Sequence, residues 1–317
     1  MNASLTIEIM APSKSSALTE LSSQLAVAVE RAADSVVAIH ARRRIPSSGI
    51  VWRDGVIVSA SHTVQRDEEI KVTLPDGETT PASIVGRDAA TDLVALRIKG
   101  KAQAAPRGVG NDAGSLRVGA LVLAVGRPGR NATASFGIVS AVGEGWRTWE
   151  GSRLDRVLRL DLAVYDGFSG GALVDASGAV LGVNNSALAR GTPMALPAGV
   201  VDRVVDELLA RGHVRRPFIG VAVQPVALPA TLAKQLTLTQ DAALLLTSVA
   251  DDSPAERAGL YVGDVLLDAN GQALHRPTDL LDALANAPAG SALALRLLRG
   301  GTATSISVTP ADRREVK

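Results

Sequence analysis

The chain has 317 residues, enough for two or three domains that each bury a core. Its 33 basic and 32 acidic residues leave a formal net charge of +1, so there is no electrostatic basis for binding nucleic acid or an anionic membrane surface. The absence of cysteine excludes disulfides, thiol catalysis and cysteine-ligated metals. Aromatic residues make up 3% of the chain, so aliphatic side chains must form the cores.

The first 34 residues predict a tail followed by a short helix. Residues 1–14 show no period and predict a mobile tail. Apolar residues recur at helical spacing from Ala17 to Ala33, with Ser15 or Ser16 as the cap. No secretory signal is visible, and no apolar run approaches the roughly 18 residues of a membrane span. We therefore expect no integral membrane segment.

A series of short strands is predicted from Ser35 onward. Asp54-Gly55 is a strong hairpin turn between two apolar runs, and His62 comes at the end of the second run. Short strands at this spacing are typical of an all-β barrel. The predicted strands cover residues 36–41, 48–53, 56–61, 69–74, 80–85 and 93–98.

A glycine-rich turn carries a serine at Gly167-Phe168-Ser169-Gly170-Gly171. Glycine permits a tight turn whose backbone N–H groups can bind an oxyanion. The pattern fits the elbow of α/β-hydrolases, but there the serine leads into a helix and aspartate and histidine follow it. Here residues 172–183 read as strand, turn and strand. This favours the other class, the trypsin-like double barrel, in which the order is His, Asp, Ser.

Three motifs occur in that order and resemble the trypsin-like serine proteases of the HtrA/Deg branch. They are Ser61-His62-Thr63-Val64, Thr91-Asp92-Leu93-Val94-Ala95-Leu96 and the serine turn. The resemblance implies a mainly β fold, with a double six-stranded barrel and neither metal nor cofactor. It also implies that His62 is the general base, Asp92 orients it, and Ser169 is the nucleophile. The N–H groups of Gly167 and Ser169 would form the oxyanion hole.

The chain departs from the family pattern within the serine motif. The family usually has asparagine where this chain has Phe168, and proline where it has Ala172. Neither position belongs to the triad, but Phe168 lies inside the oxyanion turn. His40, on an earlier predicted strand, is interpreted as a hydrogen-bonded barrel residue rather than a catalytic one.

The family pattern also predicts the primary specificity pocket. Members with an acidic pocket carry a carboxylate six residues before the nucleophile, where this chain has Ala163. Val164 lies beside it, and Ala187 and Leu188 are expected on the opposite wall. Such a lining should accept small or medium apolar side chains, because a desolvated lysine or arginine would find no partner there.

The second barrel and its boundary follow. Strand patterns occur within residues 116–128 and 137–142, and residues 143–156 predict a polar loop that exposes Trp146 and Trp149. Those tryptophans would contact another subunit, substrate or the second domain, or fold back on their own barrel. A helix after Pro197 should end at Arg211-Gly212. We assign residues 35–212 to the protease domain.

The C-terminal part resembles a PDZ domain over residues 216–311. Phe218-Ile219-Gly220-Val221 matches its carboxylate-binding loop, and residues 253–260 and 263–271 match its middle. Residues 278–286 would be the groove helix, and residues 221–223 the open sheet edge that a peptide extends as an added strand. We assign residues 213–311 to this domain and 312–317 to a tail.

The resemblance implies a serine endopeptidase that acts on unfolded or damaged proteins. The PDZ domain would recruit protein C-termini, gate the active site, or both, and homotrimers or other homo-oligomers are expected. The alternative is a catalytically weak or inactive PDZ-containing adaptor or holdase, which Phe168 keeps open. The missing signal predicts the cytoplasm, with the periplasm as the alternative because the family is commonly exported.

Overall fold

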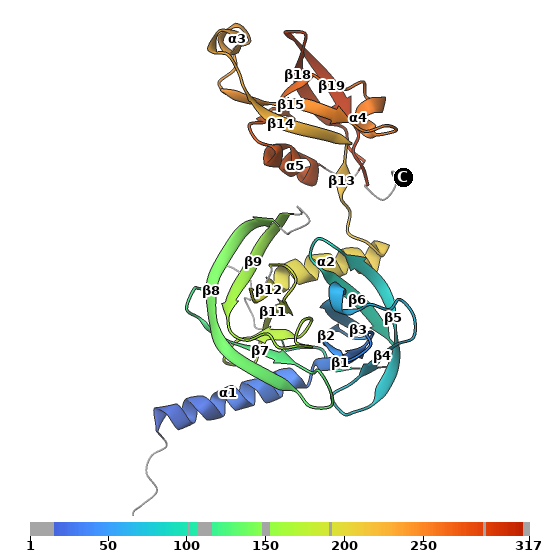
Figure 1. Ribbon diagram of the computed structural model, residues 1–317, viewed down its shortest axis with the longest axis vertical. Helices are drawn as coiled ribbons and strands as arrows, with labels where there is room; N and C mark the ends of the chain where they lie inside the picture. The colour runs from blue at the N-terminus through green and yellow to red at the C-terminus, as the bar shows by residue number, and fades with distance from the viewer. Residues whose placement is uncertain are drawn as a thin grey trace, which may run out of the picture. The chain divides into compact units, whose positions relative to one another are not determined.

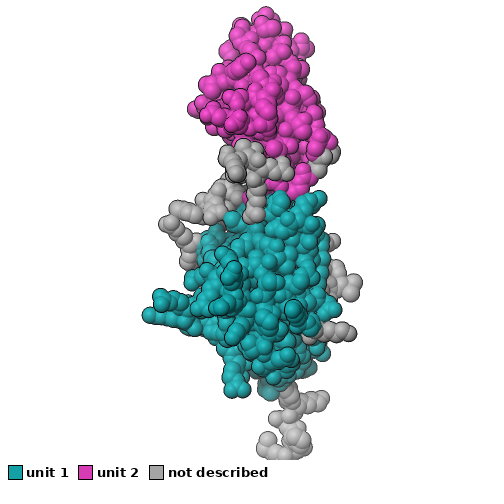
Figure 2. Space-filling view, turned by 90° about the vertical axis from the view of Figure 1, so that its right-hand side faces the viewer, with its two compact units in different colours: residues 1–214 teal, residues 215–317 magenta. Residues whose placement is uncertain are grey.

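The computed structural model describes residues 16–100, 102–106, 116–147, 153–189, 192–287 and 290–312, and the side chains of 144–147 and 153–155 are not described. The predicted tail over residues 1–14 lies outside these ranges. The chain forms two compact units, residues 1–214 and 215–317 (Figure 2).

Helix α1 spans Ala17–Ala33, as the sequence predicts. Ser16 caps it by accepting a hydrogen bond from the Thr19 N–H at 3.3 Å. Its C-terminal half packs on the barrels through Ala28 and Ala32, which are buried. Leu18, in its first turn, is 78% exposed, so only the later turns of α1 join the core.

Six strands close the first barrel in the order β1-β2-β3-β6-β5-β4. All six were predicted, and their bounds differ from the prediction by no more than a few residues at either end. A short 3-10 turn, Ser61–Thr63, follows β3 and carries His62. The strands are β1 Val36–His40, β2 Ser47–Arg53, β3 Val56–Ala60, β4 Ile70–Thr73, β5 Thr79–Asp88 and β6 Leu93–Ile98.

Six further strands close the second barrel in the order β10-β11-β12-β9-β8-β7, which completes the predicted double barrel (Figure 1). The strand β10 bears the residues that directly follow the serine turn. The strands are β7 Leu121–Gly126, β8 Thr133–Arg147, β9 Arg153–Asp161, β10 Ala172–Val174, β11 Val180–Asn185 and β12 Met194–Pro197.

The prediction of a polar loop over residues 143–156 was wrong. Strands β8 and β9 continue as a paired hairpin as far as Arg147 and Arg153, and Trp146 lies in β8 opposite Leu154. Two strands of a hairpin satisfy each other's backbone groups whatever their side chains, so polar and glycine residues did not end the pairing. Trp149 lies outside the described residues.

Helix α2, Ala198–Arg211, closes the first unit and packs against both barrels (Figure 1). Its buried face is apolar, while Asp202 accepts a hydrogen bond from the Trp52 indole N–H at 2.9 Å. Asp206 pairs with Arg53 at 2.6 Å. The helix ends at Gly212, whose φ of 76° is the left-handed conformation expected of a glycine stop.

The second unit contains a six-stranded sheet and short helices. Strand β14 lies at one edge of the order β14-β15-β16-β18-β19, as predicted for residues 221–223, and β17 pairs with β16. Strands β13 and β20 pair with each other and so bring together the first and last strands of the second unit. The strands are β13 Pro217–Phe218, β14 Val221–Ala227, β15 Ala242–Val249, β16 Val265–Ala269, β17 Gln272–Ala273, β18 Leu293–Arg299, β19 Thr302–Val308 and β20 Ala311–Asp312. The helices are α3 Ala230–Gln235, α4 Pro254–Arg257 and α5 Pro277–Asn286.

Candidate active site

The structure pairs His62 with Asp92. Their side chains meet at 2.5 Å between His62 Nδ1 and Asp92 Oδ2, and Asp92 Oδ1 accepts the backbone N–H of His62 at 2.8 Å. The carboxylate therefore fixes both the ring and the backbone of the turn that carries it. A carboxylate on Nδ1 leaves Nε2 of a neutral imidazole as the proton acceptor.

Asp92 adopts a left-handed backbone conformation, with φ 53°. This costs a non-glycine residue about 1–3 kcal/mol unless its surroundings enforce it. Here the Asp92 carbonyl accepts from the Ser61 N–H at 2.8 Å, and its N–H donates to Ala89 at 3.3 Å. The side chain of Asp88 accepts from the Thr91 N–H and hydroxyl at 3.1 and 2.7 Å. The turn is thus held in place at several points.

A second brace holds the turn that carries His62. The Arg87 guanidinium donates to the carbonyl and hydroxyl of Ser61 at 3.2 and 3.1 Å. Its other nitrogen donates to the Arg66 carbonyl and pairs with Asp67 at 3.0 Å. A planar guanidinium suits such a fork of acceptors, so Arg87 fixes the base of the His62 turn.

The serine turn packs against the end of β3. Gly167 and Gly170 have φ of 90° and 88°, which a residue with a side chain adopts only at a cost. A Cβ on Gly170 would lie 2.8 Å from the backbone nitrogen of Ala60, two residues before His62. Within the described part of the chain, the N–H groups of Gly167 and Ser169 donate to no acceptor. Two donors are therefore free on either side of Phe168.

Two adjacent residues join Asp92 to Ser169. Asn185 donates through Nδ2 to Asp92 Oδ2 at 2.7 Å. Ser186 approaches Ser169 Oγ with its own hydroxyl at 2.8 Å and donates its backbone N–H to the same oxygen at 3.2 Å. The three residues predicted as a triad thus lie in one cluster where the two barrels meet.

The nucleophile candidate is not aligned with the base. Among the described residues, the hydrogen bonds of Ser169 Oγ go to Ser186, and none joins it to His62. The contacts of Asn185 and Ser186 with Asp92 and Ser169 were not predicted. Their only sequence signal is a run of polar residues at the end of a buried strand, and it does not reveal a partner 93 residues away.

The four predicted specificity residues differ in their exposure to solvent. Ala163 and Ala187 are exposed, Val164 is half-buried, and Leu188 is buried. The carbonyl of Ala163 accepts a hydrogen bond from the Ser135 hydroxyl at 2.5 Å. These contacts do not test the lining of a pocket, which stays a prediction.

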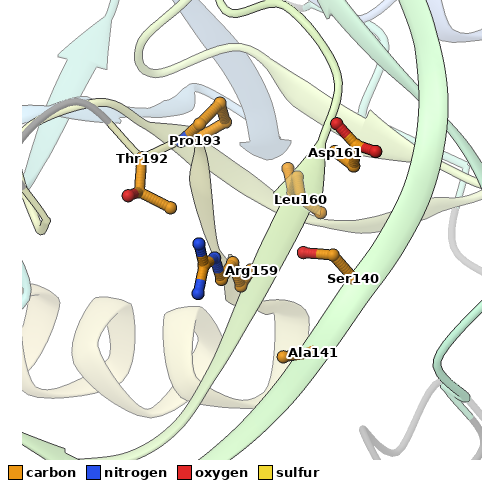
Figure 3. Close-up of a pocket in the computed structure, with 7 residues that line it drawn as sticks. All are labelled: Ser140, Ala141, Arg159, Leu160, Asp161, Thr192 and Pro193. Atoms are coloured by element: carbon orange, nitrogen blue, oxygen red, sulfur yellow. The ribbon is translucent and has the colours of Figure 1, made fainter.

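A separate pocket of about 410 Å³ lies on the second barrel. Figure 3 shows the side chains of Arg159 and Thr192 on one side of it and those of Ser140 and Asp161 on the other. None of the four predicted specificity residues lines it, so it is not the predicted specificity pocket.

The predicted carboxylate-binding loop joins β13 to β14. Its carbonyls are occupied, because Ile219 accepts from the Ala255 N–H and Gly220 from the Ala250 N–H, each at 2.8 Å. In the described part of the chain, the N–H groups of Ile219 and Gly220 have no acceptor. A Cβ on Gly220 would lie 2.3 Å from the Cβ of Ser253, and its φ is 85°. Phe218 lies in β13, and Val221 is the first residue of β14. Helix α5 packs against both strands.

Two closed six-stranded barrels, with His, Asp and Ser clustered at their junction, define the trypsin-like class of serine hydrolase fold. The sequence profile of the trypsin-like peptidase domain matches residues 47–183, and that of the PDZ domain matches residues 217–309. In the described ranges, no helix is both long and apolar enough to cross a membrane.

Comparison with individual known proteins assigns the chain to a narrower family within this class. It is 35% identical over 277 residues to a probable periplasmic serine endoprotease DegP-like of Brucella suis biovar 1 (strain 1330), covering 85% of this chain and 53% of that protein. The chain thus spans about half the length of the curated relatives it matches. Its fold resembles the HtrA-type protease AlgW with tripeptide, at 31% identity and a TM-score of 0.72, over 91% of this chain and 97% of that one. A serine endoprotease from Yersinia pestis is similar at 27% identity and a TM-score of 0.74, over 91% and 97% of the two chains. The chain belongs to the HtrA-type family of serine proteases with a PDZ domain.

Proposed function

We propose that the protein is a serine endopeptidase that hydrolyses peptide bonds of unfolded or damaged polypeptides. The observation that carries the proposal is the single cluster of His62, Asp92 and Ser169 beside two backbone donors without acceptors. His62 would remove the proton of Ser169 Oγ as it attacks the scissile carbonyl, and Asp92 would stabilise the imidazolium. The imidazolium would give its proton to the leaving amine as the peptide C–N bond breaks, and a water deprotonated by His62 would then release the acyl group from Ser169 as the new C-terminal carboxylic acid.

Attack requires one local rearrangement. The Ser169 hydroxyl must leave its hydrogen bond with Ser186 and donate to His62 Nε2. The N–H groups of Gly167 and Ser169 would then bind the oxyanion of the tetrahedral intermediate, each worth a factor of about 100 to 1,000 in rate. We propose Ala163, Val164, Ala187 and Leu188 as the specificity pocket, selective for small or medium apolar residues.

The second unit supports the regulatory part of the proposal. The free N–H groups of Ile219 and Gly220 would catch a terminal carboxylate, while the peptide extends the sheet along β14 from Val221 and Phe218 lines the loop. We propose 35–212 as the protease domain and 213–311 as the PDZ domain, with 1–34 and 312–317 as flanking segments. Assembly into a homotrimer or other homo-oligomer belongs to the same proposal.

The expectation of a cytoplasmic protein has no support from the comparisons. The curated relatives carry the word periplasmic in their names, which fits the alternative. We therefore propose that the protein acts in the periplasm. Osmotic-shock fractionation with an immunoblot of the native protein checks this, and retention with a cytoplasmic marker would contradict it.

The non-catalytic adaptor or holdase remains the second candidate, because Ser169 is bonded to Ser186 rather than to His62. Labelling by a fluorophosphonate, followed by mass spectrometry and run beside Ser169→Ala, separates the two. Labelling at Ser169 with casein cleavage after residues such as Val or Ala supports the protease. If Ser169 stays unlabelled even when C-terminal peptides are added, the adaptor is correct.

A further inference from the structure

Phe168 lies between the two free N–H groups of the serine turn, and its side chain points into the protein. It is 1% exposed and among the largest fully buried side chains. Its own backbone groups are both bonded, the N–H to the Tyr165 carbonyl at 3.0 Å and the carbonyl to the Gly171 N–H at 2.8 Å. These two bonds close the turn, while the N–H groups of Gly167 and Ser169 have no acceptor among the described residues.

The ring sits against a glycine at the end of β7. A Cβ on Gly126 would lie 2.9 Å from Phe168 Cδ1 and 3.1 Å from its Cγ, closer than side-chain carbons normally approach. Tyr165 covers the ring edge-on, with centroids 5.4 Å apart and planes at 85°. Only a residue without a side chain leaves room at 126, so Gly126 and Phe168 form a matched pair.

A buried hydroxyl ties the neighbouring peptide to the same place. Ser48, on β2, donates to the Gly167 carbonyl at 2.5 Å and accepts the Arg127 N–H at 2.7 Å. The Cβ position at Gly126 also lies 3.0 Å from the Ser48 hydroxyl. The Arg127 guanidinium is bonded to the carbonyls of Val36 and Ala33 at 2.6 and 2.9 Å. Residues of both barrels, Ser48 and Arg127, thus support the serine turn through hydrogen bonds.

We propose that Phe168 is a positioning residue for the oxyanion hole, packed against Gly126 and Tyr165. This rests on the proposed function. The hole depends on the orientation of two peptide planes, those that end in the nitrogens of Gly167 and Ser169. Because Phe168 lies between these two peptides in the chain, packing of its side chain would hold both, and an apolar contact here takes the place of the asparagine usual in the family. Substrate need not touch Phe168 for its loss to slow the chemistry.

The test compares Phe168→Leu, Phe168→Ala and Gly126→Ala with the parent chain. We expect kcat on an apolar peptide to fall about tenfold in F168L and about 100-fold in F168A, with little change in KM, since the donors act on the transition state. A peptide boronate, which forms a tetrahedral adduct on the serine, should lose affinity in parallel with kcat/KM. G126A should resemble F168A, and the double variant F168L/G126A should recover part of that loss because leucine leaves room for the new methyl.

Leu158→Ala is the matched control. Leu158 is equally buried, but it packs in the core of the second barrel and not under the turn. This variant should lose stability as F168A does and keep its kcat, when both are assayed below their unfolding temperatures. A kcat in F168A and F168L within twofold of the parent would overturn the proposal.

Amide hydrogen exchange tests the positioning role of Phe168 without an activity assay. In F168A, exchange of the Phe168 and Gly171 amides should speed at least tenfold while β9 is unaffected. In L158A we expect faster exchange in β9 and unchanged exchange of the Phe168 and Gly171 amides. If the parent and Ser169→Ala are equally inactive, the proposed function fails, yet unchanged exchange in the 165–171 turn of F168A still refutes the positioning role by itself.

Discussion

Removing the Asn185 side chain should slow catalysis without touching a triad residue. Asn185 is fully buried, and its Nδ2 donates at 2.7 Å to the same Asp92 oxygen that pairs with His62. Its Oδ1 accepts the N–H groups of Ala187 and Leu188 at 2.8 and 3.1 Å, which fixes the direction in which the amide points. Asn185→Ala therefore leaves Asp92 Oδ2 with its His62 partner but without the amide, and removes the acceptor of the Ala187 and Leu188 N–H groups.

The size of the effect follows from the charge on Asp92. A hydrogen bond to a charged group contributes about 1.5–3 kcal/mol. Since about 1.36 kcal/mol corresponds to tenfold in rate, loss of this bond should lower kcat/KM by about 10- to 150-fold if all of it serves to hold Asp92 on His62. Asn185→Asp should do more than remove a bond. A second carboxylate beside Asp92 puts a repulsive charge where the wild-type chain has a donor, so kcat/KM should fall further than in N185A.

The assay is kcat/KM across pH 4–9 on a chromogenic apolar peptide, with the downfield His62 Nδ1 proton followed by NMR. Asn184→Ala is the matched control, because Asn184 is an equally buried amide on β11 whose Nδ2 bonds the Ala172 carbonyl at 2.7 Å instead. It should cost stability and leave the profile and the proton resonance in place. If N185A and N184A share one profile, Asn185 does not act through Asp92 and the reasoning fails.

Three further outcomes follow from single contacts. Ser186→Ala removes the hydroxyl that competes for Ser169, so fluorophosphonate labelling should speed by up to about tenfold; slower labelling would show that Ser186 assists catalysis. Gly220→Ala should abolish binding of a C-terminal peptide in fluorescence anisotropy, because its Cβ meets Ser253 at 2.3 Å, while binding at parental affinity would exclude the loop. Burial alone would raise the pKa of Asp264, but hydrogen bonds from Arg299 and the Tyr261 N–H outweigh it and hold that pKa below its usual range. The second unit should therefore keep this stabilisation above about pH 4 and lose it as pH falls through the folded pKa. Pulse hydrogen exchange after urea equilibration measures that loss, which Asp264→Asn should reduce.

Most of the fold could be predicted because local patterns encode it. Alternating apolar residues and the Asp54-Gly55 turn predicted the first barrel. Apolar residues at helical spacing predicted both α1 and α2. The error over residues 143–156 arose because strand pairing there depends on a partner strand and not on apolar side chains. A long hairpin with polar faces looks like a loop when each strand is read alone.

The candidate site was only partly visible in the sequence. His62, Asp92 and Ser169 stand at strand ends in a recognisable order, and each has a chemistry that its residue type announces. Asn185 and Ser186 have no such mark, since an amide and a hydroxyl acquire a role here only through contacts made across the barrel junction. Phe168 was identified as a departure from the family pattern, but the sequence does not predict that its side chain is buried.

The arrangement around Ser169 limits how far its hydroxyl alone could keep the proposed protease inactive. The Asp92–His62 pair is formed and the two oxyanion donors are free, while the Ser169 hydroxyl is bonded to Ser186. Exchanging that neutral hydrogen bond for one to His62 costs at most about 1.5 kcal/mol, or roughly tenfold in rate. Breaking this one hydrogen bond is therefore too small a barrier to silence the proposed protease. Strong latency would need the turn around Phe168, or the Asp92–His62 pair itself, to take a second conformation.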